Sequence, residues 1–167
     1  MTDEARPQDW SNVPLCEIPA DAQNDDGSGF WDAFTSDTGM SREELLAVQQ
    51  KHLKKDGTPR DLHIVVQGPL WFIFKPLNQK EYRDLGMKQA EDERKLAEIL
   101  ASKTPPIKLT ESDVNFLMGT NTCSMAVIVP ESFDFMNDDL PPTLVANLYT
   151  EIMFRSGIQD VMLTKKL

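Results

Sequence analysis

The sequence predicts an α+β protein: a small apolar β-hairpin packed by about four helices, with an acidic and largely irregular N-terminal arm. Three observations carry this prediction. Two short apolar runs flank a Gln-Gly-Pro turn within residues 62–77. Four segments outside the hairpin pair a helix-start signal with apolar residues at helical spacing. The first 40 residues sustain neither a helical nor a strand period.

Residues 1–40 form the acidic arm. They carry nine acids and one base, a net charge of −8, within a total of −10 for the whole chain. Their richness in Asp, Ser, Asn, Gly and Pro predicts little independent order. The excess of acid also disfavours direct binding to nucleic acid, because phosphates would meet like charge.

Aromatic residues interrupt this arm at Trp10, Phe30, Trp31 and Phe34. Acidic segments with interleaved aromatic residues often dock on a basic, grooved partner. The alternative is that these rings fold back on the protein's own core. The sequence leaves both interpretations open.

The first helix is expected over residues 42–52. Ser41 and Glu44 form a capping-box signature, in which each side chain bonds the backbone N–H of the other residue. The lysines near the expected C-terminal end suit the negative end of the helix dipole. An Asp-Gly-Thr-Pro run then separates the helix from the hairpin.

The hairpin of residues 62–77 is expected to be apolar on both faces. Side chains alternate along a strand, so Trp71 and Ile73 point to one face, and Phe72 and Phe74 point to the other. A two-stranded sheet is marginal alone, so helices must cover at least one face. The other face needs more of this chain or another subunit, which leaves homo-oligomerisation open.

A long helix is expected over residues 79–101, because Asn78 and Glu81 form a second N-terminal cap. Thr110 and Asp113 cap a third helix. Residues 119–122 could interrupt that helix, and residues 125–129 are expected to continue as helix rather than turn to strand.

The last helix is the clearest in the chain. Pro141 and Pro142 precede an apolar stripe with helical spacing, and proline is tolerated in a first helical turn. Ser156 and Gly157 are expected to end it, because glycine accepts the left-handed cap conformation. Residues 161–167 form a short C-terminal tail.

No catalytic constellation is recognisable, and no enzymatic activity, cofactor or metal is expected. Cys16 and Cys123 have no histidine near them in sequence, and His63 in a strand is interpreted as structural. Two cysteines and no recognisable leader or membrane segment favour a soluble protein in a reducing cytosol. The loop before the last helix contains four acids: Glu131, Asp134, Asp138 and Asp139. Paired carboxylates there could form an acid–base catalytic site, which is the enzymatic alternative. Helix capping and solubility explain these acids better.

Two stretches resemble the tail assembly chaperones of long-tailed bacteriophages. The first is residues 74–82, FKPLNQKEY, in which a hairpin ends in a Lys-Pro-Leu step into a helix start. The second begins with Val-Pro-Glu at residues 129–131, passes through Asp-Leu-Pro-Pro at 139–142, and ends with Arg-Ser-Gly-Ile at 155–158. The similarity covers residues 41–160, which places a domain there between the arm and the tail.

The resemblance implies a non-enzymatic protein that binds the tape-measure protein or the tail tube during assembly in the host cytoplasm. The acidic arm departs from the family pattern. It favours a second hypothesis, a structural component of the tail, hub or baseplate that stays in the virion. The expected partner-binding residues are the arm aromatics and one face of the hairpin: Trp10, Phe30, Trp31, Phe34, Trp71 and Ile73.

Overall fold

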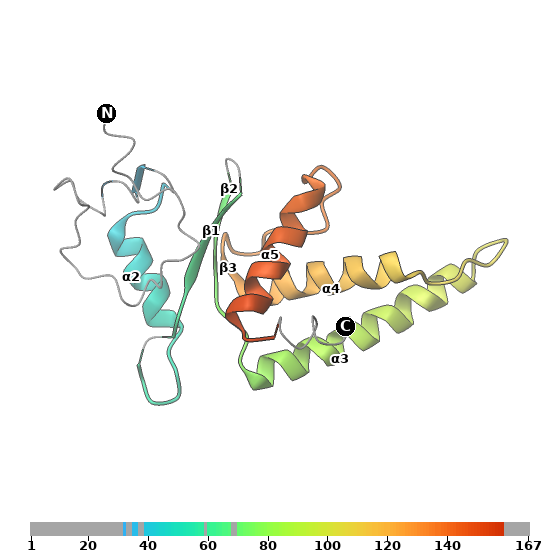
Figure 1. The fold of residues 1–167 in the computed structure, drawn as a ribbon, viewed down its shortest axis with the longest axis horizontal. Helices are drawn as coiled ribbons and strands as arrows, with labels where there is room; N and C mark the ends of the chain where they lie inside the picture. The colour runs from blue at the N-terminus through green and yellow to red at the C-terminus, as the bar shows by residue number, and fades with distance from the viewer. Residues whose placement is uncertain (1–31, 33–34, 37–38, 59, 68–69, 159–167) are drawn as a thin grey trace. The chain divides into compact units, whose positions relative to one another are not determined.

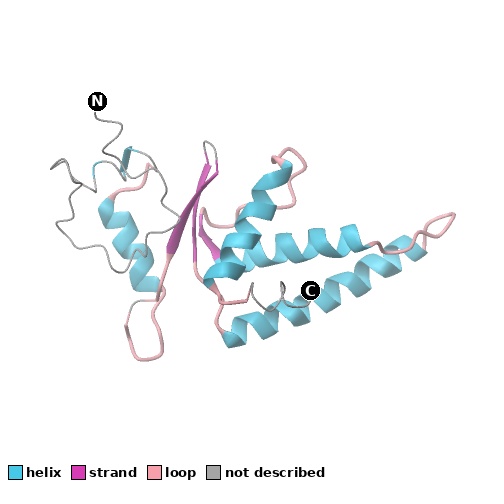
Figure 2. Ribbon diagram, viewed as in Figure 1, coloured by secondary structure: helices cyan, strands magenta, loops and turns pink. Residues whose placement is uncertain are grey.

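The computed structural model describes residues 32, 35–36, 39–58, 60–67 and 70–158 (Figure 1). The chain divides into two compact units, residues 1–75 and 76–167, and each is described separately. The domain expected over residues 41–160 is thus divided after Lys75. The described elements are helices and short strands, which confirms the α+β class (Figure 2).

Helix α2 of the first unit spans Arg42–Lys51 and confirms the first predicted helix. The Ser41 hydroxyl accepts a hydrogen bond from the Glu44 N–H at 3.2 Å, and the Glu44 carboxylate accepts one from the Ser41 N–H at 3.3 Å. These reciprocal bonds satisfy two of the N–H groups that a helix start leaves without partners. Leu45 is fully buried and anchors the helix in the unit.

The hairpin consists of β1, His63–Gln67, and β2, Leu70–Phe74, paired antiparallel as the sequence predicts. His63 lies opposite Phe74, and their rings stack with centroids 5.6 Å apart, which agrees with a structural role for this histidine. The register runs from this pair to Gln67 opposite Leu70.

The second half of β2 is buried on both faces, which corrects the expectation that Ile73 lies on a face open to a partner. Ile73 has 0% exposure, like Phe72 and Phe74, although its side chain points to the opposite face. Leaving a side chain of this size in water forfeits about 1.5–3 kcal/mol of burial free energy, so an apolar hairpin is driven to cover both sides. Trp71 is partly exposed.

The second unit contains α3, Gln79–Ala101; α4, Glu111–Ala126; β3, Val127–Val129; and α5, Pro142–Arg155. Helix α4 packs against both α3 and α5. Helices α3 and α4 form a hairpin joined by the loop at residues 102–110 (Figure 1). The expected capping boxes are present at Asn78 and Thr110. Gly157, with φ of +77°, follows the last helix as predicted.

Two expectations for α4 are wrong. Residues 119–122 do not interrupt the helix, and the helix ends at Ala126 instead of continuing to residue 129. Thr120 and Thr122 donate their hydroxyl protons to carbonyls one turn back, so their polar side chains are satisfied inside a helix. Residues 127–129 are Val-Ile-Val, and β-branched side chains fit a pleated strand better than a helix.

A buried polar network joins α3 to α4. The Asn121 amide donates to the Gln89 side-chain oxygen and to the Asp92 carboxylate, both at 3.0 Å, and the Gln89 amide donates to the Val114 carbonyl at 3.1 Å. A hydrogen bond from Lys88 at 2.9 Å, followed by the bond from Asn121, lowers the pKa of the Asp92 carboxyl. The network therefore fixes the register of α4 against α3.

No helix among the described residues is both long and apolar enough to span a membrane.

Candidate docking surface

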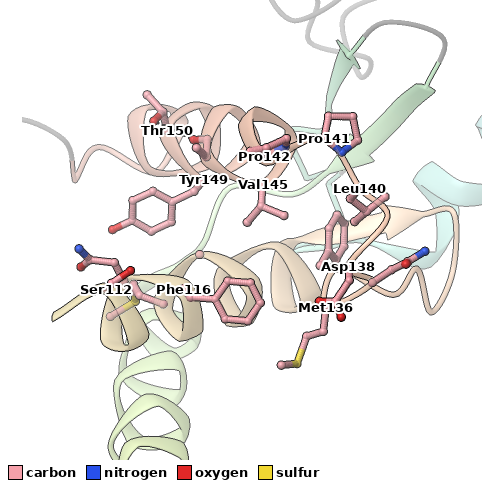
Figure 3. A pocket seen from close by; sticks show the side chains of 16 residues that line it. Ser112, Phe116, Met136, Asp138, Leu140, Pro141, Pro142, Val145, Tyr149 and Thr150 are labelled. Atoms are coloured by element: carbon pink, nitrogen blue, oxygen red, sulfur yellow. Dashed lines mark hydrogen bonds between the residues drawn. The ribbon is translucent and has the colours of Figure 1, made fainter. Parts of the chain in front are cut away.

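The second unit contains an open hollow, which we name the α4–α5 hollow, with a volume of about 720 Å³ (Figure 3). Three segments line it: the N-terminal half of α4, the loop after β3, and the first two turns of α5. Its lining residues from α4 are Ser112, Asn115, Phe116, Met118 and Gly119; from the loop, Phe135, Met136, Asn137, Asp138, Leu140 and Pro141; and from α5, Pro142, Val145, Ala146, Tyr149 and Thr150.

The two helices approach most closely on one side of the hollow. A side-chain Cβ placed on Gly119 would lie only 3.1 Å from Val145 Cγ1, so any larger residue here would require the Val145 side chain to shift. The Cys123 Sγ lies 3.8 Å from the Val145 carbonyl oxygen in the next turn of α4. The lining residues of α4 run from Gly119 back toward the N-terminus of the helix. The hollow therefore opens on the N-terminal side of the contact between Gly119 and Val145.

Large apolar side chains in the hollow remain open to solvent. Phe116 on α4 is 49% exposed, and Met136 on the loop is 55% exposed. Val145 and Tyr149 are half-buried and point from α5 toward α4 (Figure 3). Apolar side chains gathered in one concave region are characteristic of binding surfaces rather than of ordinary protein surface.

Short-range hydrogen bonds shape the loop that presents Met136. Asp134 accepts a bond from the Met136 N–H at 3.0 Å, and Asn137 accepts one from the Asp139 N–H at 2.9 Å. Phe135, only 3% exposed, anchors the loop between them. Aspartate and asparagine side chains stabilise turns in this way. Asp134 therefore has a structural task, and the loop acids remain only a predicted alternative for acid–base chemistry.

Acidic residues lie close to both ends of the hollow, although only Asp138 lines it among the described residues. Asp138 is the one charged residue among the described residues that line it, and Asp139 follows in the chain. At the other end Ser112 lies between Glu111 and Asp113 at the start of α4. Backbone and side-chain hydrogen bonds from Thr110 lower the pKa of the Asp113 carboxyl, which is therefore ionised at neutral pH.

Cys123 and Tyr149 are neutral at physiological pH. Burial raises the pKa of the Cys123 thiol to about 12, so it is not an activated nucleophile. Burial also raises the pKa of the Tyr149 hydroxyl, and the nearby Tyr82 raises it further. Cys123 does not line the hollow, so of these two groups only the neutral Tyr149 hydroxyl is available to a ligand there, beside the apolar side chains and Asp138.

The residues predicted as partner-binding have different positions in the structure. Trp71 is partly exposed, but Ile73 is fully buried and offers no surface to a partner. The four arm aromatics lie outside the described residues: Trp10, Phe30, Trp31 and Phe34.

Sequence reasoning missed the hollow. Phe116 and Tyr149 were expected only as parts of apolar helix stripes, and Met136 lies in a loop distinguished by its acids. Phe116 in a capped helix was the one signal that could have pointed to the site. The periodicity of the helix does not separate this position from core positions, so its exposure could not be predicted.

Within the described part of the chain, no group of three or more His, Cys, Asp or Glu side chains is placed to hold a metal ion. Comparison of the chain with protein-family models, with curated proteins and with solved structures finds no match.

Proposed function

We propose that this chain is a non-enzymatic bacteriophage tail assembly protein that binds the tape-measure protein or another tail component in the host cytoplasm. The α4–α5 hollow is the observation that carries this proposal. Its open apolar side chains, Phe116 and Met136, belong to the same compact unit as residues 76–82 of the first resembling stretch and the whole of the second.

A contact between those two stretches supports the proposal. The Leu77 N–H, within the Lys-Pro-Leu step, donates a hydrogen bond of 2.9 Å to the Ser156 hydroxyl, 79 residues later. The same hydroxyl donates to the Ile152 carbonyl at 2.6 Å and so joins the end of α5 to the start of α3. This bond supports the proposal because it brings one residue from each resembling stretch together at a single junction.

The charge and the hollow suit such a function physically. A long helical tape-measure chain exposes apolar stripes until the tail tube forms around it. A binder that covers those stripes, and carries a net charge of −10, would keep the complex dispersed by repulsion between copies.

Affinity capture of the tagged full-length chain from phage-infected cells tests the proposal. We expect the tape-measure protein to be recovered in stoichiometric amount with the chain. Recovery of no tail component would contradict the proposal.

A structural virion component is the alternative function, and mass spectrometry of purified mature particles separates the two. An assembly chaperone is absent from the particle or present only in traces. Stoichiometric presence in mature tails would overturn the chaperone proposal and favour a tail, hub or baseplate subunit.

A further inference from the structure

We infer that the α4–α5 hollow binds an amphipathic helix of the partner, with apolar side chains on the face that enters and basic side chains at its two ends. The partner's identity as a tail component rests on the proposed function. The chemistry of the helix follows from the length, the lining and the charge of the hollow.

The length of the hollow fits two turns of helix. Its α4 lining runs from Ser112 to Gly119, a separation of seven residues, or about 10.5 Å at 1.5 Å per residue. Its α5 lining runs from Pro142 to Thr150, about 12 Å by the same measure. A helix that anchors in a groove through residues i, i+3 or i+4, and i+7 spans the same 10.5 Å.

The lining provides contacts for such a row of anchors. Phe116 and Met136 are about half exposed and come from α4 and the loop, while Val145 and Tyr149 line the hollow from α5 (Figure 3). Apolar anchors of a bound helix would remove these side chains from water. The backbone polar groups of an incoming helix are already paired within it, so an apolar lining leaves none of them unsatisfied.

The charge selects a basic helix. No described residue that lines the hollow is lysine or arginine, and Asp138 with Asp139 marks one end. Glu111 and Asp113 mark the other end, at the start of α4. Lysine or arginine flanking the apolar anchors would meet an acid at each end, whereas a helix of the same shape with acidic flanks would meet like charge.

A designed peptide tests these requirements with the full-length chain. The probe is a fluorescein-labelled Leu/Lys peptide of roughly 18 residues, five helical turns, with leucine at helical spacing. A Leu/Glu peptide with the same leucine stripe tests the charge, and a scrambled Leu/Lys peptide tests the spacing. Fluorescence anisotropy should give at least tenfold tighter binding of the first peptide than of either control, and this binding should weaken as salt rises.

Three variants place the binding in the hollow. Phe116→Ser and Met136→Ser should each weaken binding of the Leu/Lys peptide at least fivefold, and Asp138→Lys should weaken it while improving binding of the Leu/Glu peptide. Met87→Ser is the matched control, because Met87 is 72% exposed on α3 and does not line the hollow. Circular dichroism confirms that each variant is folded, which is expected because every changed side chain is exposed.

Three outcomes of the peptide titrations would overturn the inference: equal binding of the Leu/Lys and Leu/Glu peptides, no effect of Phe116→Ser and Met136→Ser in folded proteins, or an equal effect of Met87→Ser. A dimer that Phe116→Ser dissociates in analytical ultracentrifugation would identify a second copy as the occupant and overturn it as well. Capture of the tape-measure protein unaffected by Phe116→Ser would refute the hollow but leave the proposed function standing. Peptide binding in the hollow without capture of any tail component would contradict the proposed function but leave the inference about the hollow standing.

Discussion

The buried network between α3 and α4 gives a prediction whose size follows from the structure. Gln89 is 4% exposed and Asn121 is 8% exposed, and the Asn121 amide donates to both Gln89 and Asp92. Asn121→Leu deletes both bonds and leaves the Gln89 oxygen buried without this donor, which costs about 1–3 kcal/mol. Asp92 is partly exposed and keeps its bond to Lys88. Loss of the hydrogen bond from Asn121 to Asp92 therefore adds at most about 1 kcal/mol.

We therefore expect Asn121→Leu to lower the free energy of unfolding by about 1–4 kcal/mol, and Gln89→Leu by about 1–3 kcal/mol. The double variant should lose at least about 1 kcal/mol less stability than the sum of the two single losses. In the double variant two apolar side chains face each other, so no buried amide is left without its partner. Ser124→Leu, at an exposed position on α4, is the control for adding leucine to this helix.

Urea unfolding followed by far-ultraviolet circular dichroism provides the measurement. All three tryptophans, Trp10, Trp31 and Trp71, precede Pro76, so tryptophan fluorescence reports on the first unit. The signal of helices α3, α4 and α5 dominates the dichroism and reports on the second. Strictly additive costs in the double-mutant cycle would show that the two amides do not act together, and would refute the assigned network.

Three further predictions concern other parts of the fold. Ile73→Ser should lower the free energy of unfolding by about 3 kcal/mol or more, whereas Ile99→Ser, at a position 55% exposed, should cost under about 1 kcal/mol in the same urea titration; equal costs would contradict the burial of both hairpin faces. The lowered pKa of Asp92 contributes stability above the unfolded value near 3.8 and loses it as pH falls through the folded pKa. Asp92→Asn should therefore be less stable than wild type at pH 7, and the difference should shrink at pH 3; a constant difference would argue against this linkage. Gly119→Ala should be more favourable in a Val145→Ala background than in wild type by about 1 kcal/mol, because the new methyl then has room; identical effects in the two backgrounds would place the helix contact elsewhere.

Local signals in the sequence were sufficient to predict most element boundaries. The capping boxes at Ser41, Asn78 and Thr110 each involve residues three apart, so their hydrogen bonds can be inferred without knowing the fold. The hairpin register follows from the position of its turn, and the end of α5 follows from Gly157.

Features that depend on tertiary packing could not be predicted in this way. Residues 127–129 were expected to be helical, although their β-branched side chains favour the strand that is present. Ile73 was expected on an open face because alternation gives the direction of a side chain but not what covers it. The hollow depends on the close approach at Gly119 and on a loop shaped by Asp134, neither of which has a periodic signature.

If the proposed function holds, a tape-measure protein is encoded in the same genome, and co-expression of this chain with it tests the central claim most directly. The measured quantity is the fraction of tape-measure protein that stays in the supernatant after centrifugation. We predict that wild type and Met87→Ser raise this fraction severalfold over the tape-measure protein alone, and that Phe116→Ser does not. A fraction that is unchanged by the wild-type chain would contradict the assembly function.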